Sequence, residues 1–511
     1  MSTHLRPSAV PGITLRGLHA TLAGVPLPAG DLEVPITGVT LDSRSVLPGD
    51  LYAALPGARA HGASFAASAV QAGAVAVLTD ERGRELADVQ VPVLVVPDPR
   101  ACLGELAATI YGQPGRKLRT VGITGTNGKT TTAYILDAAL RAASHVTGLI
   151  GTIETRVATE RVRSVRTTPE SPDLHALLAL MVERKVDVAT MEVSSHALAL
   201  HRVDGLIFDV ALFTNLSQDH LDFHHTMQEY FEAKAGLFTA HRCRQGIICV
   251  DDDWGQRLAE IASVPVSTVS SDPARAADWH LLAEPGQSEF VLRAESGEAL
   301  SLRSALPGDF NRMNTALAAL ALRVAGMSDE AIVAAIHAGV TVPGRAERVD
   351  LGPGAPQAVI DFAHTPEAVA NVLAALRAQM QGPLVAVLGA GGDRDAGKRE
   401  MMGARAAQVA DEVVVTDDNP REEDPELIRA AVLRGALGCA EEPARCHQVA
   451  GREAAIEYAL RLAGPNGLVA VLGKGHEDGQ EIHGVVHPYN DRDALTQAWA
   501  RCRRTPERPI S

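Results

Sequence analysis

The stretch that decides the fold is VGITGTNGKTTTAYIL, residues 121–136. Its apolar beginning predicts a buried strand over residues 120–124, and its end predicts a helix over residues 129–143. Three glycines between them let the backbone turn tightly and bring its N–H groups against phosphate oxygens. The N-terminus of the following helix adds positive potential at the same place. The stretch therefore predicts a strand, a phosphate-binding loop and a helix, in that order.

Lys129 and Thr130 carry the chemistry of this loop. A lysine in this position reaches the β- and γ-phosphates of a nucleotide, and the hydroxyl that follows it ligates Mg²⁺. The loop is a variant, because Ile123 stands where the standard pattern has its first glycine. The loop does not reveal which acceptor takes the phosphoryl group. The loop predicts binding of ATP or GTP, and the residues expected to bind this nucleotide are Gly125, Thr126, Asn127, Gly128, Lys129, Thr130 and Thr131.

Composition narrows the class of protein. The chain has 511 residues, which suggests about three domains at ~150 residues each. No stretch approaches the ~20 apolar residues of a membrane span, and the N-terminus lacks a secretory apolar segment. A net charge of −15 argues against a general nucleic-acid binder. Six scattered cysteines without CxxC spacing predict reduced thiols and a cytoplasmic protein.

Apolar runs alternate with helical patterns along most of the chain, which indicates an α/β fold with mainly parallel sheets. YGQPGRKLR, residues 111–119, is rich in turn formers and reads as a linker. A second boundary falls near Val342, in TVPGRAERVD. The predicted domains are therefore 1–115, 116–342 and 343–511. Polar clusters follow the predicted strands, where open parallel sheets bind their ligands.

Several long motifs, taken together, resemble the Mur ligases of peptidoglycan synthesis. They are TGTNGKTTT, MEVSSHAL, NLSQDHLDFH, EAKAGLF, GRAERV, DFAHTPEAV, GAGGDRDAGKRE, DDNPREE and GKGHED, which span almost the whole chain. Their order is similar to the MurE type, which adds the third residue to UDP-N-acetylmuramoyl-L-Ala-D-Glu. The resemblance implies a small UDP-substrate-binding domain, a P-loop ATPase domain and a Rossmann-like domain for the incoming amino acid.

The resemblance also implies the reaction. The D-Glu γ-carboxylate attacks the γ-phosphorus of ATP, and an amine of the incoming amino acid displaces phosphate from the acyl phosphate. Since every ligand is anionic, metal ions and basic side chains must offset charge while geometry aligns the attack. We expect a monomer whose partners are these small molecules.

Glu192, His220 and Lys234 are the catalytic candidates beside Lys129. From spacing alone, Glu192 could be a metal ligand or part of an ion pair. Composition favours a solvated loop around His220. Lysines such as Lys234 usually lie at the surface. The resemblance instead implies that Glu192 and His220 bind metal, as Thr130 does. It further implies that CO₂ carbamylates Lys234, and that the resulting anion ligates a second Mg²⁺.

The resemblance implies contacts for the other substrates as well. The residues implied at the UDP end are Leu41, Ser43, Ala58, Arg59 and Ala60, and those at the muramoyl-peptide are Thr167, Thr168, Ser194 and Arg202. The residues implied to close over ATP are Asn311, Asn314, Arg345, Glu347, Asp361 and His364. The chain departs from the family pattern at His61, Arg166, Leu200 and Gln218.

The C-terminal motifs concern the choice of amino acid. The implied contacts are Arg394, Asp418, Asn419, Pro420, Arg421, Gly473 and Glu477. DNPR is similar to the version in enzymes that add meso-diaminopimelate, whose distal carboxylate can pair with Arg421 while Glu477 takes the distal ammonium. If the acidic run Glu422, Glu423 and Asp424 neutralises Arg421, L-lysine or L-ornithine is the substrate.

Three rival functions stay open. Another Mur or folylpolyglutamate-type ligase would have a different first domain, and DNPR with GKGHE would be out of place in it. A non-catalytic relative would have lost the chemistry, yet Lys129, Thr130, Glu192, His220 and Lys234 are all present. A P-loop kinase would release a phosphorylated product instead of a new amide.

Overall fold

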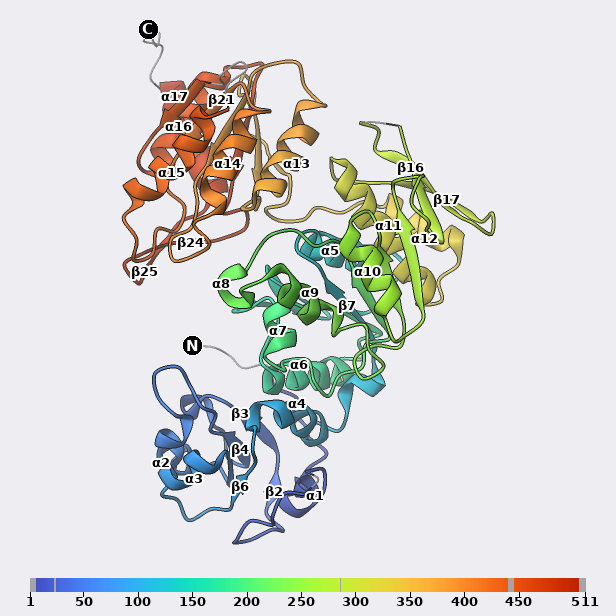
Figure 1. The fold of residues 1–511 in the computed structure, drawn as a ribbon, viewed down its shortest axis with the longest axis vertical. Helices are drawn as coiled ribbons and strands as arrows, with labels where there is room; N and C mark the ends of the chain where they lie inside the picture. The colour runs from blue at the N-terminus through green and yellow to red at the C-terminus, as the bar shows by residue number, and fades with distance from the viewer. Residues whose placement is uncertain (1–5, 23, 285, 440–444, 505–511) are drawn as a thin grey trace.

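The computed structural model describes residues 6–22, 24–284, 286–439 and 445–504. It shows three α/β units arranged along the long axis of the molecule (Figure 1). They are built on sheets of four, eleven and six strands, and we call them the N-terminal, central and C-terminal units. This confirms the predicted three-domain α/β architecture, while the limits at residues 115 and 342 stay predictions. Within the described residues no helix is long and apolar enough to cross a membrane.

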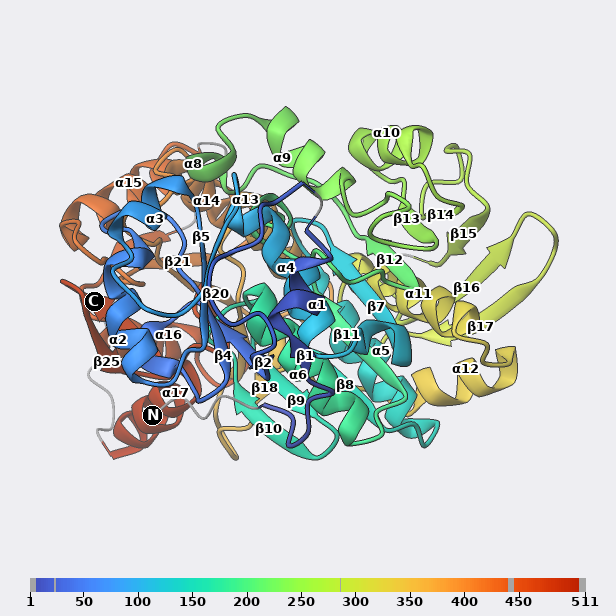
Figure 2. The ribbon, with the colours of Figure 1, turned by 90° about the horizontal axis from the view of Figure 1, so that it is seen from below.

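The N-terminal unit has a parallel sheet in the order β3-β4-β5-β6. Each strand comes from one of the short apolar runs in the sequence, and Figure 2 looks at this unit from below. Its elements are β1 (Ile13–Thr14), α1 (Leu15–His19), β2 (Pro35–Ile36), β3 (Gly38–Thr40), η1 (Ser43–Ser45), β4 (Asp50–Ala53), η2 (Gly62–Phe65), α2 (Ala66–Gln71), β5 (Ala76–Thr79), α3 (Glu81–Leu86), β6 (Val93–Val95), α4 (Pro99–Ile110) and η3 (Pro114–Lys117).

The central unit has the strand order β10-β9-β8-β11-β7-β12-β13-β14-β15-β16-β17, parallel from β8 to β15 and antiparallel at both ends. The first strands and helices are β7 (Arg119–Thr124), α5 (Lys129–Ala142), β8 (Thr147–Ile150), β9 (Glu154–Val157), β10 (Glu160–Arg163), α6 (Ser171–Glu183), β11 (Val188–Glu192), α7 (Ser195–Ala199), β12 (Val210–Phe213), α8 (Leu221–His224) and α9 (Met227–Ala235). The rest are β13 (Gly246–Cys249), α10 (Asp253–Ile261), β14 (Val266–Ser270), β15 (Trp279–Leu282), β16 (Glu289–Ala294), β17 (Ala299–Arg303), α11 (Asp309–Val324) and α12 (Asp329–His337).

Both faces of this sheet are covered by apolar side chains of the packed helices. Its strands are apolar on both sides, so each face must be buried. Helices α5, α11 and α12 pack on one face, and α6, α7, α9 and α10 pack on the other. The carboxyl ends of β7, β11 and β12 therefore meet at one edge between the two layers.

The C-terminal unit has the order β18-β19-β23-β20-β21-β22, parallel except for β18. Helices α13, α14 and α15 cover one face, and α16 and α17 cover the other. Its elements are β18 (Glu347–Val349), β19 (Gln357–Asp361), α13 (Pro366–Arg377), β20 (Leu384–Leu388), α14 (Lys398–Ala407), β21 (Glu412–Val415), α15 (Pro425–Leu437), β22 (Arg445–Gln448), α16 (Arg452–Ala463), β23 (Leu468–Leu472), β24 (Gly479–Ile482), β25 (Val485–Pro488) and α17 (Asp491–Arg504).

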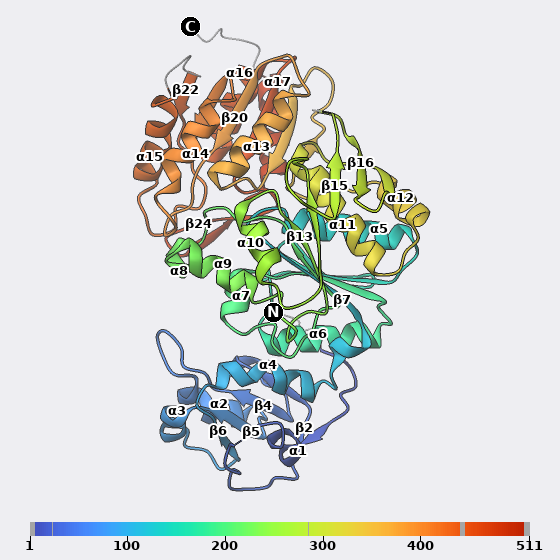
Figure 3. The ribbon, with the colours of Figure 1, turned by 45° about the vertical axis from the view of Figure 1, so that its right-hand side comes forward.

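The C-terminal unit faces the central unit through its loops. Figures 1 and 3 both show the β24–β25 hairpin beside α8 of the central unit. Short apolar runs of the sequence form β19, β20, β21 and β23, whose carboxyl ends point to the same side. The edges at which the parallel strands of the two sheets end are thus brought together.

Candidate functional site

The phosphate loop has the backbone shape that the sequence predicts. Gly125 and Gly128 have φ values of +143° and +87°, and β-carbons there would lie 1.9 Å from the Thr214 hydroxyl and 2.4 Å from Asn314 Oδ1. Only glycine fits both places. The Lys129 ammonium donates to the carbonyl oxygens of Gly125 and Thr126 at 2.9 Å each, so it lies folded over the loop.

Glu192 ends β11 directly beside the loop and is 1% exposed. Its carboxylate accepts hydrogen bonds from the Thr130 hydroxyl at 2.9 Å and from the backbone N–H and hydroxyl of Thr152 at 2.7 and 3.0 Å. Thr130 and Glu192 therefore present adjacent hard oxygen donors, the type that Mg²⁺ prefers. Among the described residues no group of three or more His, Cys, Asp or Glu side chains could hold a metal. Mg²⁺ usually takes one or two protein oxygens together with phosphates and water, and Thr130 and Glu192 can supply these oxygens.

Lys234 lies in α9 with only 1% of its surface exposed. Its ammonium donates to the Gly125 carbonyl at 2.7 Å and lies 4.6 Å from the centre of the Tyr230 ring. Burial, and then the nearby charge of Lys129, lower the pKa of Lys234 well below its usual value, against the opposing effect of Asp219. Lys234, which belongs to a residue type that usually lies at the surface, is thus a buried amine beside the phosphate loop.

Asp219 and His220 lie where the central and C-terminal units meet. The Asp219 carboxylate is 3.5 Å from His220 Nε2, 3.8 Å from His364 Nε2 and 3.6 Å from Lys398 Nζ. Burial acts to raise the pKa of Asp219, but His364, His220 and Lys398 outweigh it and lower the pKa below its ordinary range. Burial lowers the pKa of His220 to about 3, so the imidazole is neutral and can act as a ligand.

Of the residues predicted to close over ATP, Arg345 and Asn314 contact the phosphate loop or the start of the helix that follows it. Arg345 donates to the Thr130 hydroxyl at 3.2 Å and lies 4.6 Å from the centre of the Phe362 ring. Asp361 accepts hydrogen bonds from the backbone N–H groups of Ala346 and Ala363 at 2.6 and 2.8 Å. Asn314 accepts from Thr132 at 3.3 Å and donates to Asn311 at 3.0 Å. Glu347 instead pairs with Arg492.

A cavity of about 1100 Å³ lies between the N-terminal and central units. Leu41, Ser43 and Ala60 of the predicted UDP contacts line it. Ala58 and Arg59 lie on the exposed turn before Ala60 and are not among the lining residues. His61, a departure from the family pattern, bonds to Asp80 at 3.0 Å and accepts from the Ala63 N–H at 3.1 Å, a local structural role.

The predicted muramoyl-peptide contacts connect this cavity to the phosphate loop. The Thr168 hydroxyl donates to the Glu192 carbonyl at 2.9 Å and lies 3.3 Å from the Ser194 hydroxyl, while the Thr167 and Thr152 hydroxyls are 3.0 Å apart. Arg202 pairs with Glu170 at 2.9 Å. Glu170 also pairs with Arg100 and with Arg166, at 3.1 and 3.3 Å. Three arginines around one carboxylate leave this wall of the site cationic.

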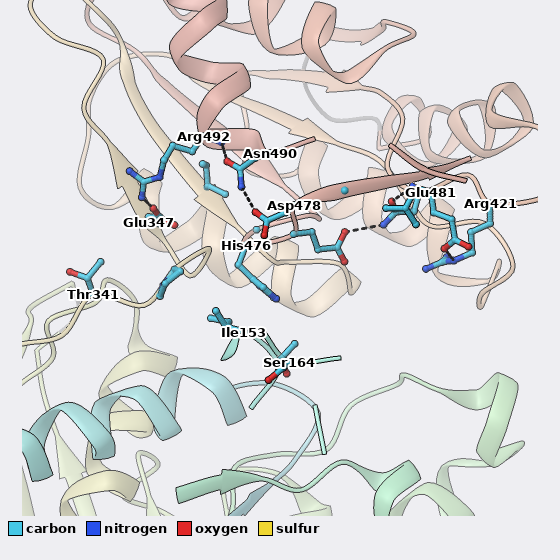
Figure 4. Close-up of a pocket in the computed structure, with 18 residues that line it drawn as sticks. Ile153, Ser164, Thr341, Glu347, Arg421, His476, Asp478, Glu481, Asn490 and Arg492 are labelled. Atoms are coloured by element: carbon cyan, nitrogen blue, oxygen red, sulfur yellow. Dashed lines mark hydrogen bonds and ion pairs between the residues drawn. The ribbon is translucent and has the colours of Figure 1, made fainter. Parts of the chain in front are cut away.

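A second cavity, of about 550 Å³, lies between the central and C-terminal units (Figure 4). Asn419, Arg421 and Glu477 of the predicted amino-acid contacts line it, opposite Ile153 and Ser164 of the central unit. Asp418, Pro420 and Gly473 adjoin these residues but are not among those that line it. Arg394 lies elsewhere, 4.0 Å from Asp222 of α8.

The acidic run after Arg421 does not neutralise it. Glu423 pairs with Arg399 at 2.8 Å, and Asp424 caps α15. The partner of Arg421 is Glu481 on the hairpin, which accepts from Nε at 3.1 Å, while Nη1 donates to the Gly392 carbonyl at 2.6 Å. Arg421 is thus held by two acceptors, and its Nη2 has no partner in the part of the chain that the structure describes.

Known proteins are similar to this chain over most of its length. Three family models match the chain. They are described as "Mur ligase middle domain" (residues 123–322), "Mur ligase, glutamate ligase domain" (residues 344–475) and "Mur ligase family, catalytic domain" (residues 35–111). A UDP-N-acetylmuramoyl-L-alanyl-D-glutamate–2,6-diaminopimelate ligase of Streptomyces coelicolor is 52% identical over 498 residues, covering 96% of this chain and 97% of that protein. The chain belongs to the Mur ligase family.

Other similarities agree. A protein of the same name from Corynebacterium glutamicum is 46% identical over 493 residues, 94% of this chain and 95% of its own length. A solved structure described as a UDP-N-acetylmuramoyl-L-alanyl-D-glutamate–2,6-diaminopimelate ligase has a TM-score of 0.68 and 30% identity, covering 97% of this chain and 100% of its own. The Mur ligase assignment thus holds for sequence and fold alike.

Sequence reasoning missed several residues that shape the site of this Mur ligase. Thr152, Lys474 and Glu481 contact predicted site residues, and Lys398 lies 3.6 Å from Asp219, the neighbour of the predicted His220. Lys398 and Lys474 lie inside motifs that carried the family resemblance, so their place in the sequence could have marked them as site residues. Thr152 and Glu481 lie in a turn and a hairpin with no chemical pattern of their own.

Proposed function

We propose that this Mur ligase is the ATP-dependent enzyme that adds meso-diaminopimelate to UDP-N-acetylmuramoyl-L-Ala-D-Glu, giving the tripeptide nucleotide, ADP and phosphate. The observation that carries the proposal is the position of Thr152. Its backbone and hydroxyl contact Glu192 at the phosphate loop, its hydroxyl contacts Thr167 of the muramoyl-peptide wall, and it lines the amino-acid cavity. Three sites meet at one residue, as a three-substrate condensation requires.

The side chains around this point suit the proposed chemistry. Arg202 and Thr168 hold the acidic dipeptide so that its γ-carboxylate faces the γ-phosphate of ATP, and Lys129 and Arg345 offset the charge that develops. Thr130 and Glu192 would hold Mg²⁺, which would supply further positive charge beside the phosphates. The acyl phosphate then receives the amine of the amino acid from the cavity that Arg421 lines.

We further propose that Lys234 carries a carbamate in the active enzyme. A carbamate forms only from a neutral amine, and the lowered pKa of the buried Lys234 favours that form. The carbamate is an anion beside the phosphate loop. His220 lies in the same site, and its imidazole is neutral because burial lowers its pKa. Both groups can then take part in holding a second metal ion.

The amino acid is proposed from the contacts of Arg421. Its unpartnered Nη2, with Nη1, can receive a distal carboxylate, which L-lysine and L-ornithine lack. The relatives named as diaminopimelate ligases support this choice. One observation favours a simple diamino acid instead, because Glu481 already offsets part of the Arg421 charge.

Two further properties are proposed. All six cysteines are free thiols, which fits the reducing cytoplasm in which nucleotide-linked precursors are made. We propose a monomer, because every residue assigned to the site belongs to this one chain.

The test is a stoichiometry measurement with purified protein, the nucleotide dipeptide, ATP, Mg²⁺ and meso-diaminopimelate. The proposal predicts equal amounts of ADP, phosphate and new amide, and no net phosphate release when the amino acid is omitted. A stable phosphorylated product would indicate a kinase. No turnover with any substrate would indicate a non-catalytic relative.

A further inference from the structure

Lys474, two residues after the end of β23, is a fully buried charged side chain beside the amino-acid cavity, with 0% of it exposed. Burying an ammonium costs several kcal/mol unless it is paired and hydrogen-bonded. Its partners are Asn419 Oδ1 at 3.0 Å and Glu477 Oε2 at 2.9 Å, with Asp418 at 4.0 Å. The buried lysine therefore sits under two residues that line the cavity.

These contacts fix both side chains. Asn419 Oδ1 accepts from Lys474 and from the backbone N–H of Glu481 at 3.0 Å, and its Nδ2 donates to Glu477 Oε2 at 2.9 Å. Glu477 Oε2 thus receives two donors. Its Oε1 has no hydrogen-bond partner among the described residues, and this oxygen can accept from an incoming ammonium.

The backbone holds Lys474 in place from both sides. Gly473 has φ of +109°, and a β-carbon there would lie 2.5 Å from Asp418 Oδ2. Gly475 has φ of +56°, and a β-carbon there would lie 2.8 Å from the Phe362 side chain and 2.9 Å from the Gly344 carbonyl. The lysine is therefore placed between the DNPR loop and the segment that joins the central and C-terminal units.

We propose that Lys474 is a positioning residue of the amino-acid site. Through Asn419 and Glu477 it orients the carboxylate that receives the side-chain ammonium of the diamino acid, and it offsets the charge of that carboxylate. The inference rests on the proposed function in one respect, that the cavity takes a diamino acid.

The test compares Lys474→Met with Lys117→Met, a matched change at an exposed lysine of η3. We expect KM for meso-diaminopimelate to rise at least about tenfold in Lys474→Met, from the loss of charge-assisted hydrogen bonds. KM for ATP and for the nucleotide dipeptide should stay within about twofold of the wild-type values. Loss of a merely structural contact would instead raise KM for all three substrates. Lys117→Met should match the wild type.

A double-mutant cycle with Glu477→Gln shows whether Lys474 acts through Glu477. We expect Lys474→Met to change KM much less in the Glu477→Gln background than alone. Additive effects, an unchanged KM for the amino acid, or equal changes for all three substrates would overturn the proposal. If Lys474→Met does not fold, Lys474→Gln takes its place in the comparison. If neither variant folds, Lys474 is needed for folding, and the proposal is overturned. If the wild type takes L-lysine, the diaminopimelate assignment fails, but the same comparison made with L-lysine still tests Lys474.

Discussion

Replacing Arg421 with alanine tests how the cavity selects its amino acid. Arg421 is 23% exposed, and Glu481 and the Gly392 carbonyl hold Nε and Nη1. A distal carboxylate on this guanidinium makes charge-assisted hydrogen bonds worth about 1.5–3 kcal/mol in a partly buried site. Their loss corresponds to a rise in KM for meso-diaminopimelate of roughly ten- to 150-fold. L-Lysine lacks that carboxylate, so its use should change little or improve.

The assay is amide synthesis with either amino acid at saturating ATP and nucleotide dipeptide. Arg445→Ala, at an arginine on the edge strand β22 that is 81% exposed, is the matched control and should leave both KM values unchanged. Glu481→Gln should lower KM for meso-diaminopimelate, because it removes the carboxylate that competes for Arg421. Equal increases for both amino acids in Arg421→Ala, or no change for either, would refute this reasoning.

Three other perturbations have defined outcomes. Lys129→Ala should lower kcat at least ~10²-fold while the protein stays folded, and near-normal amide synthesis would remove Lys129 from the ATP site. Lys234→Ala should lose most activity and regain part of it with a small carboxylate in the buffer, whereas full activity in Lys234→Arg would exclude a carbamate. Burial lowers the pKa of His175 from 6.5 to about 4. Between these two pH values the unfolded chain binds a proton that the folded protein does not. The free energy of unfolding should therefore fall as the pH drops from 6.5 toward 4, by up to roughly 3 kcal/mol. His175→Gln should flatten the fall of Tm over this range, and parallel curves for variant and wild type would contradict it.

The strand, loop and helix around Lys129 could be predicted because their pattern is local. β7 and α5 begin and end within one residue of the predicted limits, since apolar periodicity and glycine placement specify them. The edge strand β22 could not be predicted, because its sequence RCHQ has no apolar run.

Parts of the site depend on long-range docking, which a single sequence does not specify. Glu481 reaches Arg421 only because the hairpin folds back beside it, and Lys398 meets Asp219 only because two units dock. A lysine is usually exposed, so the burial of Lys234 and Lys474 could not be read from their sequence. The resemblance identified Lys234, but only the structure shows its buried amine.

The measurement that tests the central claim most directly is amino-acid competition. The wild-type enzyme receives ATP, Mg²⁺ and UDP-N-acetylmuramoyl-L-Ala-D-Glu with meso-diaminopimelate, L-lysine and L-ornithine at equal concentration, and mass spectrometry identifies the nucleotide product. The free Nη2 of Arg421 and the oriented Glu477 predict that the product carries predominantly diaminopimelate, with one ADP and one phosphate for each amide. Predominant incorporation of lysine or ornithine would contradict the diaminopimelate site, and the absence of any new amide would contradict the ligase itself.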